Sequence, residues 1–120
     1  REAVGMHTHH DIDYVEFTVR DLAAAKRFYS AAFGWEFTDY GPEYAGIKGK
    51  DREPGGFRQS DDVRTGGPLP VLYSHDLETS LAAVRSAGGT ITTEPFDFPG
   101  GRRFHFKDPS GNELAVWSER

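Results

Sequence analysis

The sequence predicts an α+β domain built from two copies of a βαβββ unit, and three observations lead to this prediction. A stretch of alternating apolar and polar residues is followed by a capped stretch with helical spacing. The same order restarts in the second half, and the two halves are separated by a constant number of positions. The 120 residues are enough for one such domain with its own core.

The first half begins with a strand over residues 14–19. Apolar and polar residues alternate along it, so we expect one face to pack on a helix and the other to face away from it. The first face carries Val15, Phe17 and Val19, and the second carries Tyr14, Glu16 and Thr18.

A helix is predicted directly after this strand. Asp21 is a suitable N-cap because its side chain can accept backbone N–H bonds, and Gly34 is a suitable end because it tolerates positive φ. Between them, apolar residues recur at helical spacing: Leu22, Ala25, Phe28, Tyr29, Ala32 and Phe33.

Three short strands complete the first half. They are expected around residues 35–37, over 44–48 and over 57–60, with Gly41-Pro42 and Gly55-Gly56 as turn signals. The charged segment 48–53 is predicted to be an exposed turn with little chemistry of its own.

The second half repeats this order from Pro70 onwards. The strand PVLYSHDL leads to the cap Asp76, and a helix runs to Gly88-Gly89. The differences 76 − 21 and 89 − 34 both equal 55, as expected for duplicated units. Strands are predicted over residues 90–93, 103–107 and 113–118, with DPSGN as the last turn and residues 61–69 as the linker.

Composition excludes several classes of function. The net charge of −5, from 14 Lys plus Arg and 19 Asp plus Glu, argues against a nucleic-acid partner. No apolar run is long enough to cross a membrane, and without cysteine there are no disulfides or thiolate sites. No signal peptide is recognised, so we expect a cytoplasmic protein.

Residues 1–10 show no apolar periodicity and are predicted to be an N-terminal tail, partly vector-derived, outside a single domain over residues 11–120. The two modules cover about residues 13–60 and 69–119. The tail histidines His7, His9 and His10 offer metal donors, but a solvated segment is the favoured interpretation.

Two motifs, VRDLAAAKRFYSAAFGWEF in the first half and KDPSGNELAVW in the second, resemble the vicinal oxygen chelate superfamily of glyoxalase I, bleomycin resistance proteins and extradiol dioxygenases. The resemblance covers about residues 13–119 and points to an uncharacterised glyoxalase-like subgroup. It implies that the paired modules form a curled mixed sheet, a cup with the helices outside. It also implies a homodimer and a small organic ligand.

In metal-using members of that superfamily, the cup holds a divalent ion. The resemblance places three of its ligands at Tyr14, Leu69 and Ala115, and the fourth on the strand around residues 57–60. None of the three is a suitable donor, and Arg58, Gln59 and Ser60 are poor ones. We therefore predict no cofactor and no metal ligands, unless the ligands have been relocated.

Strand alternation selects the residues expected to face the cup. Glu16 and His105 are the candidate acid and base, because a carboxylate on an enclosed face and an inward histidine are both suited to proton transfer. The candidate ligand-binding residues are Tyr14, Thr18, Tyr44, Arg58, Val71, Tyr73, Glu113 and Trp117. Structural roles as core filling or ion pairs remain open for all of them.

Three functions follow as hypotheses. The first is a metal-independent small-molecule-binding protein of the bleomycin-resistance type. The second is a small lyase or isomerase that uses Glu16 and His105 as acid and base. The third is a metal-dependent glyoxalase- or dioxygenase-like enzyme with ligands relocated to Glu16, His105 and Glu113.

Overall fold

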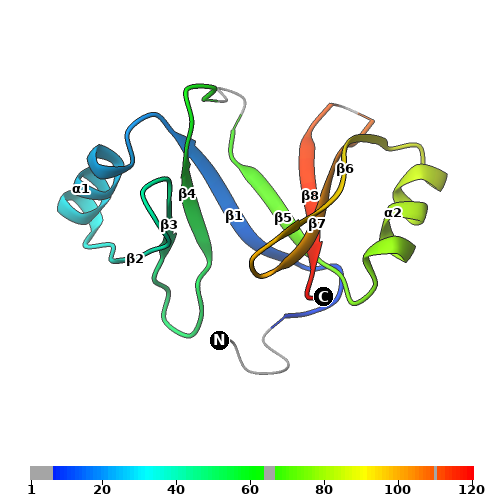
Figure 1. The fold of residues 1–120 in the computed structure, drawn as a ribbon, viewed down its shortest axis with the longest axis horizontal. Coiled ribbons are helices and arrows are strands. Elements are labelled where there is room, and N and C mark those ends of the chain that lie inside the picture. The colour runs from blue at the N-terminus through cyan, green and yellow to red at the C-terminus, as the bar shows by residue number, and fades with distance from the viewer. Residues whose placement is uncertain (1–6, 64–66, 110) are drawn as a thin grey trace. The chain divides into compact units, whose positions relative to one another are not determined.

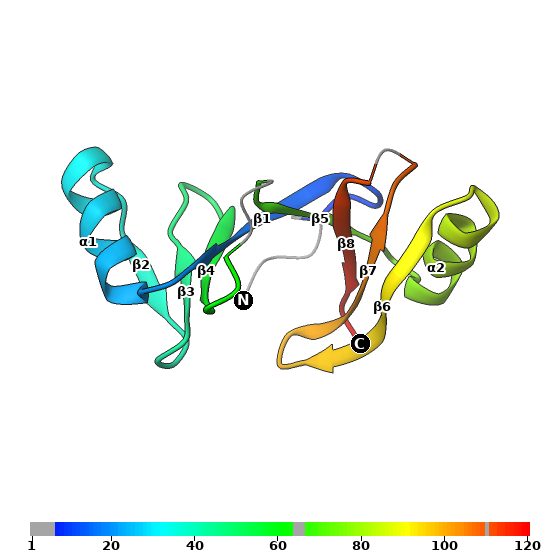
Figure 2. The same ribbon diagram turned by 90° about the horizontal axis from the view of Figure 1, so that it is seen from above.

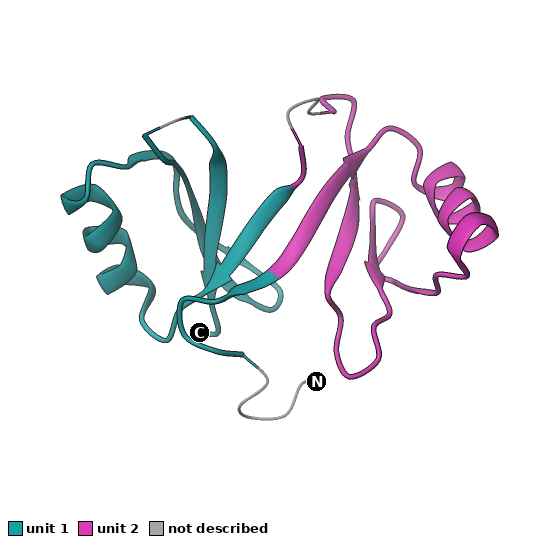
Figure 3. Cartoon of the chain, turned by 180° about the vertical axis from the view of Figure 1, so that it is seen from behind, with its two compact units in different colours: residues 1, 3–13, 69–120 teal, residues 2, 14–68 magenta. Residues whose placement is uncertain are grey.

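The structure, a computed structural model, describes residues 7–63, 67–109 and 111–120. The chain divides into two compact units, shown in different colours in Figure 3. Unit 1 contains the described residues of 7–13 and 69–120, and unit 2 contains those of 14–68. Each unit consists of four strands of the sheet, covered on one face by one helix (Figures 1 and 2).

Unit 2 follows the order strand, helix, strand, strand, strand. Its elements are β1 (Ile12–Val19), α1 (Leu22–Phe33), β2 (Phe37–Asp39), β3 (Tyr44–Ile47) and β4 (Gly55–Gln59). The sheet order is β2-β3-β4-β1, with β1 parallel to β4 and the other neighbours antiparallel.

Unit 1 repeats this arrangement. Its elements are β5 (Leu69–Tyr73), α2 (Leu77–Ser86), β6 (Thr90–Phe98), β7 (Gly101–Lys107) and β8 (Glu113–Ser118). The order β6-β7-β8-β5 has β5 parallel to β8 and the other neighbours antiparallel, so it matches unit 2 strand for strand. The predicted α+β class with two βαβββ modules is confirmed.

Each unit has its own apolar core between helix and sheet. In unit 2, α1 covers Ala45, Ile47 and Phe57, with Phe17 and Val19 of β1 packed beside them. In unit 1, α2 covers Phe104 and Val116 in the same way. The apolar face predicted for the first strand is therefore the face that packs on the helix.

The helix ends are formed by the predicted residues. The side chain of Asp21 accepts a hydrogen bond from the backbone N–H of Ala24, and Gly34 adopts the left-handed conformation with φ of 73°. Asp76 caps α2 in the same way through Thr79. These caps satisfy N–H groups that have no partner inside the helix.

Strand β6 is longer than the predicted residues 90–93. It continues through Pro95 to Phe98, with register shifts between Ile91 and Thr93 and between Thr93 and Phe96. A proline normally argues against a strand, but β6 is an edge strand, and an irregular edge tolerates the missing N–H.

Among the described residues, no helix has the length and apolar content needed to span a membrane.

We predict that Asp21→Ala lowers the free energy of unfolding by about 1 kcal/mol, because α1 loses the side-chain acceptor of its first turn. Urea unfolding followed by circular dichroism measures the loss. The control is Asp51→Ala, at an exposed turn position of the same unit. Equal losses in the two variants would show that the cap contributes nothing.

Candidate functional site

The candidate side chains lie on the sheet faces turned away from the helices. In unit 2, Phe17 and Val19 pack toward α1, so the alternate residues Glu16 and Thr18 take the opposite face. In unit 1, Phe104 and Phe106 pack toward α2, which leaves His105 on the opposite face. Both placements agree with the alternation in the sequence.

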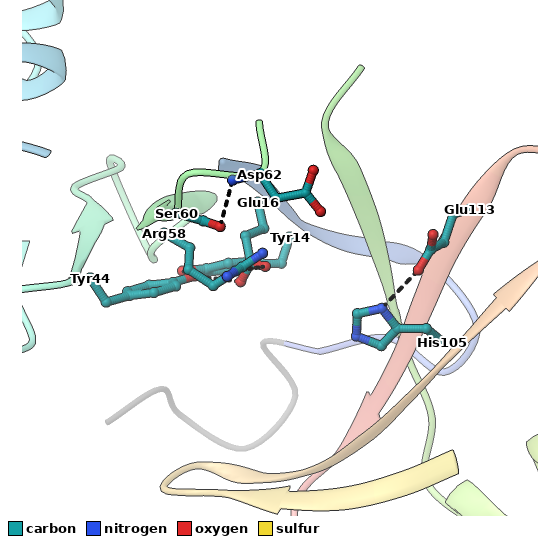
Figure 4. A network of polar contacts seen from close by, with 8 residues as sticks. All are labelled: Tyr14, Glu16, Tyr44, Arg58, Ser60, Asp62, His105 and Glu113. Atoms are coloured by element: carbon teal, nitrogen blue, oxygen red, sulfur yellow. Dashed lines mark hydrogen bonds and ion pairs between the residues drawn. The ribbon is translucent and has the colours of Figure 1, made fainter. Parts of the chain in front are cut away.

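Glu16 is the centre of a polar cluster in unit 2. Only 5% of it is exposed, so its carboxylate needs donors within the protein. The hydroxyl of Tyr44 donates to Oε1 at 3.0 Å, and Arg58 Nε lies 3.7 Å from Oε2. Figure 4 shows these side chains converging from β1, β3 and β4.

Tyr14 extends this cluster along the sheet. Its hydroxyl lies 2.7 Å from the hydroxyl of Tyr44 and donates to Glu53 Oε2 at 3.0 Å. Glu53 Oε1 also accepts from the hydroxyl of Tyr40 at 2.7 Å. The prediction of an exposed turn over residues 48–53 is wrong for Glu53, because two tyrosines bring this half-buried carboxylate onto the sheet.

Two glycines make room for these side chains. Gly46 and Gly56 are paired between β3 and β4, and Gly56 is also the partner of Glu16 on β1. A Cβ at Gly56 would lie 2.4 Å from the Tyr14 hydroxyl, and one at Gly46 would lie 2.0 Å from Glu53 Oε1. The tyrosines and Glu53 therefore occupy the space where side chains of β3 and β4 would otherwise stand.

The residues at the ligand positions implied by the resemblance do not fit a divalent cation. Burial, together with Tyr44 and Glu53, raises the pKa of Tyr14 far above its ordinary value, which disfavours the phenolate form that a cation would need as a ligand. Leu69 and Ala115 are apolar and buried. In the described part of the chain, no three His, Asp or Glu side chains are grouped to hold a metal.

In unit 1, the structure brings together His105 and Glu113. His105 Nδ1 lies 3.2 Å from Glu113 Oε2, and both side chains are largely buried, at 14% and 13% exposure. The hydroxyl of Thr92 donates to the same carboxylate oxygen at 3.4 Å. A carboxylate in contact with one ring nitrogen fixes the orientation of the imidazole, as in many acid–base sites.

Tyr73 and Trp117 form a second group in unit 1. Tyr73 donates to Glu119, and Trp117 Nε1 donates to Asp13 Oδ2 at 3.0 Å. The two rings are in edge contact, with centroids 5.2 Å apart. The neighbouring candidate Val71 is buried and paired with Ala115.

The segment predicted to be a solvated tail packs on unit 1 from His7 onwards. His7 Nδ1 lies 2.8 Å from Asp13 Oδ1, and the His7 ring stacks on the ring of Tyr73. His7 packs on this unit because the buried carboxylate of Asp13 needs hydrogen-bond donors.

His9 also packs on unit 1. Its ring stacks on the rings of His10 and His75, and its Nδ1 accepts a hydrogen bond from the backbone N–H of His75. Desolvation, followed by His10 and His75, lowers the pKa of His9.

The candidate residues thus fall into separate groups. Tyr14, Glu16, Thr18, Tyr44 and Arg58 belong to unit 2, whereas Val71, Tyr73, His105, Glu113 and Trp117 belong to unit 1. The pairing of Glu16 with His105, and the relocated metal site that adds Glu113, draw on both units and stay predictions. Thr18 is half-buried and lies opposite Arg58 in the sheet.

Several site residues were not found from the sequence: Glu53, Tyr40, Thr92, Asp13 and His7. Glu53 and Tyr40 lie in loops between strands, where alternation gives no direction for a side chain. Gly46 and Gly56 were the available signal for Glu53, because glycines facing each other across two strands leave space that another side chain fills.

The family model of the Glyoxalase/Bleomycin resistance protein/Dioxygenase superfamily matches residues 11–116. Among curated proteins, the chain is 31% identical over 117 residues to an anthracycline biosynthesis protein, DauV, from Streptomyces sp. (strain C5). The match covers 88% of this chain but 40% of that protein, so the chain spans less than half the length of this relative.

Solved structures share the fold. The Mn(II)-bound glyoxalase from Novosphingobium aromaticivorans has a TM-score of 0.70 at 27% identity, covering 92% of this chain and 39% of that one. Methylmalonyl-CoA epimerase from Mycobacterium tuberculosis has a TM-score of 0.69 at 16% identity, covering 100% and 93%. The repeated βαβββ units and the match over residues 11–116 together show that this chain belongs to the Glyoxalase/Bleomycin resistance protein/Dioxygenase superfamily.

Proposed function

We propose that the chain binds a small organic molecule without a divalent metal, in the manner of a bleomycin-resistance-type protein. The observation that carries the proposal is the set of hydrogen bonds made by the Tyr14 hydroxyl, together with its raised pKa. This residue stands at an implied ligand position, yet its hydroxyl is engaged by Tyr44 and Glu53 and its pKa is raised. Such a phenol anchors neighbouring polar groups and is a poor ligand for a cation.

The polar anchor for the molecule is the pair Arg58 and Glu16. The side chain of Arg58 is 46% exposed, and its contact with Glu16 at 3.7 Å leaves guanidinium N–H donors for a further acceptor. Glu16 holds the guanidinium from the sheet side and is itself held by a hydrogen bond from the Tyr44 hydroxyl. A ligand with an acidic or carbonyl oxygen satisfies this arrangement, because charge-assisted hydrogen bonds are the stronger kind.

The relative DauV suggests the first class of ligand to test. Its name connects it with anthracycline biosynthesis, and anthracyclines are planar polycyclic molecules with several hydroxyl and carbonyl oxygens. The tyrosines of unit 2 offer flat apolar surfaces beside hydroxyl groups, which suits such molecules.

We predict saturable binding of at least one compound from a panel of hydroxylated polycyclic quinones in the presence of a chelator, measured by calorimetry. Arg58→Ala should weaken it about tenfold to a hundredfold, because a hydrogen bond to a charged group contributes about 1.5–3 kcal/mol. The matched control is Arg27→Ala, an exposed arginine on α1 in the same unit. Binding that appears only after Mn²⁺ is added, or no binding at all, would refute the proposal.

Acid–base catalysis is the second candidate function, and the contact between His105 and Glu113 favours it. A largely buried histidine oriented by a carboxylate can remove and return a proton next to a carbonyl group. The earlier hypothesis of Glu16 as the partner of His105 remains an alternative within the same function.

For this second function, we predict that the protein exchanges an acidic C–H for deuterium in at least one α-hydroxyketone or thioester of a test panel. Proton NMR in D₂O measures the exchange. His105→Gln should slow it by about 10² to 10⁴-fold, the usual contribution of a general base. Lys107→Gln, at an exposed position of the same strand, is the control. Exchange by His105→Gln at the rate of the unchanged protein would exclude His105 as the base.

We also propose that the protein is cytoplasmic and that it forms a homodimer, the latter because its resemblance to the superfamily implies one. Pairing between copies would cover exposed sheet edges, which otherwise attract other strands. Light scattering at micromolar concentration should give the mass of two chains. The mass of one chain would refute the dimer.

A further inference from the structure

The imidazole ring of His7 is enclosed by two aromatic side chains of unit 1. It stacks on the ring of Tyr73, with centroids 4.9 Å apart and an angle of 22° between the planes. The ring of Trp117 lies perpendicular to it, with centroids 5.0 Å apart. Only 8% of the His7 side chain is exposed. Two aromatic rings therefore contact a third, flat ring from different sides.

Asp13 supplies a polar contact to the same ring. This residue is 5% exposed, and its Oδ1 lies 2.8 Å from His7 Nδ1. A carboxylate has no hydrogen to give, so the N–H of His7 is the donor in this contact. The other oxygen, Oδ2, accepts from Trp117 Nε1 at 3.0 Å. The hydrogen bond from Trp117 holds the carboxyl group in place, so that Oδ1 is directed at the His7 ring.

The contacts of His7 with these three side chains are made by its imidazole ring, which is the part of the residue that a free molecule can reproduce. We propose that Asp13, Tyr73 and Trp117 form a binding site for a small planar nitrogen heterocycle with an N–H donor. His7 closes this site as a built-in occupant. A free heterocycle of the same chemistry binds by taking the place of the His7 ring.

A turn in the chain places His7 over the site. The backbone N–H of Asp11 donates to the carbonyl oxygen of Thr8 at 3.1 Å. His10 is the third residue of this turn and has φ of 68°. A residue other than glycine is uncommon in that conformation, so further contacts are needed to support it. One of them is the hydrogen bond from the backbone N–H of His10 to the carbonyl oxygen of Tyr73, at 2.6 Å.

The His7 ring can leave the site while the turn stays attached to β5. The backbone N–H of Tyr73 also donates to the carbonyl oxygen of Asp11, at 3.1 Å, so the backbone bonds to β5 begin at His10. Rotation about the bonds of His7 and Thr8 is enough to move the ring away. A free heterocycle competes with this tethered ring, and its apparent affinity is reduced by the fraction of molecules in which the site is closed.

This site does not depend on the proposed function. The anchor proposed there is Arg58 with Glu16 in unit 2, and it offers N–H donors to a ligand oxygen. The site beneath His7 belongs to unit 1 and does the reverse, because Asp13 accepts an N–H from the ligand. Tyr73 and Trp117 were candidate ligand-binding residues on strand alternation alone, and here they receive a defined class of ligand.

Removal of the His7 ring tests the site, with imidazole as the probe. His7→Ala in the full chain should bind imidazole saturably and at least about tenfold more tightly than the unchanged protein, which corresponds to a site open in about a tenth of the molecules or fewer. The indole N–H signals in ¹H–¹⁵N NMR measure binding. The chain has two tryptophans, so Trp35→Phe identifies the signal of Trp117. The matched control is Thr8→Ala, at the exposed neighbouring position, which should bind imidazole no better than the unchanged protein.

A second ligand tests the contact with Asp13 without any further substitution. 1-Methylimidazole has the same ring but no N–H at about pH 8.5, where free imidazoles are largely uncharged. It should bind His7→Ala at least about tenfold more weakly than imidazole does, because it cannot donate to Asp13.

Three results would each overturn the proposal. The first is a Trp117 signal that does not shift saturably when imidazole is added to His7→Ala. The second is equal affinity of imidazole for His7→Ala and for the unchanged protein, which would mean that His7 does not close the site. The third is equal affinity of imidazole and 1-methylimidazole for His7→Ala. None of these results depends on whether the protein binds a quinone.

Discussion

Burial of the Glu16 carboxylate is the constraint on which the polar face of unit 2 depends. A carboxylate removed from water must find donors, and on a sheet these come from the neighbouring strands. Tyr44 and Arg58 provide them from β3 and β4. The Tyr44 hydroxyl then needs its own neighbour, which is Tyr14, and Tyr14 in turn holds Glu53. The absence of side chains at Gly46 and Gly56 leaves the space that Tyr14, Tyr44 and Glu53 occupy.

The two units share a strand order but have different chemistry at matching positions. Glu16 is paired with Gly56 between β1 and β4, and the corresponding pair between β5 and β8 is Val71 with Ala115. Polar groups in one unit thus correspond to apolar ones in the other. In unit 1, polar contacts form at other positions, between His105 and Glu113 and between Trp117 and Asp13. Duplication of the backbone therefore does not imply duplication of the site.

Much of the fold could be predicted because its signals are local. The caps Asp21 and Asp76, the stop at Gly34 and the alternation of β1 each act within a few residues. The end of β6 could not be predicted, because strand pairing outweighs the local effect of Pro95. The site was harder still. Alternation places Glu16 and His105 on the correct faces, but the partners Glu53 and Asp13 are chosen by contacts between residues far apart in sequence.

The first strand has a consequence for how the halves of this chain can be separated. The boundary between the two units falls within β1, because Asp13 belongs to unit 1 and Tyr14 to unit 2. A fragment cut after Pro68 would carry away Asp13, the buried acceptor for Trp117 and the partner of His7. The remaining fragment would leave the indole N–H of Trp117 without that acceptor. The two halves therefore cannot be separated by a cut in the linker alone: a separate second half would have to be supplied with residues 7–13 as well.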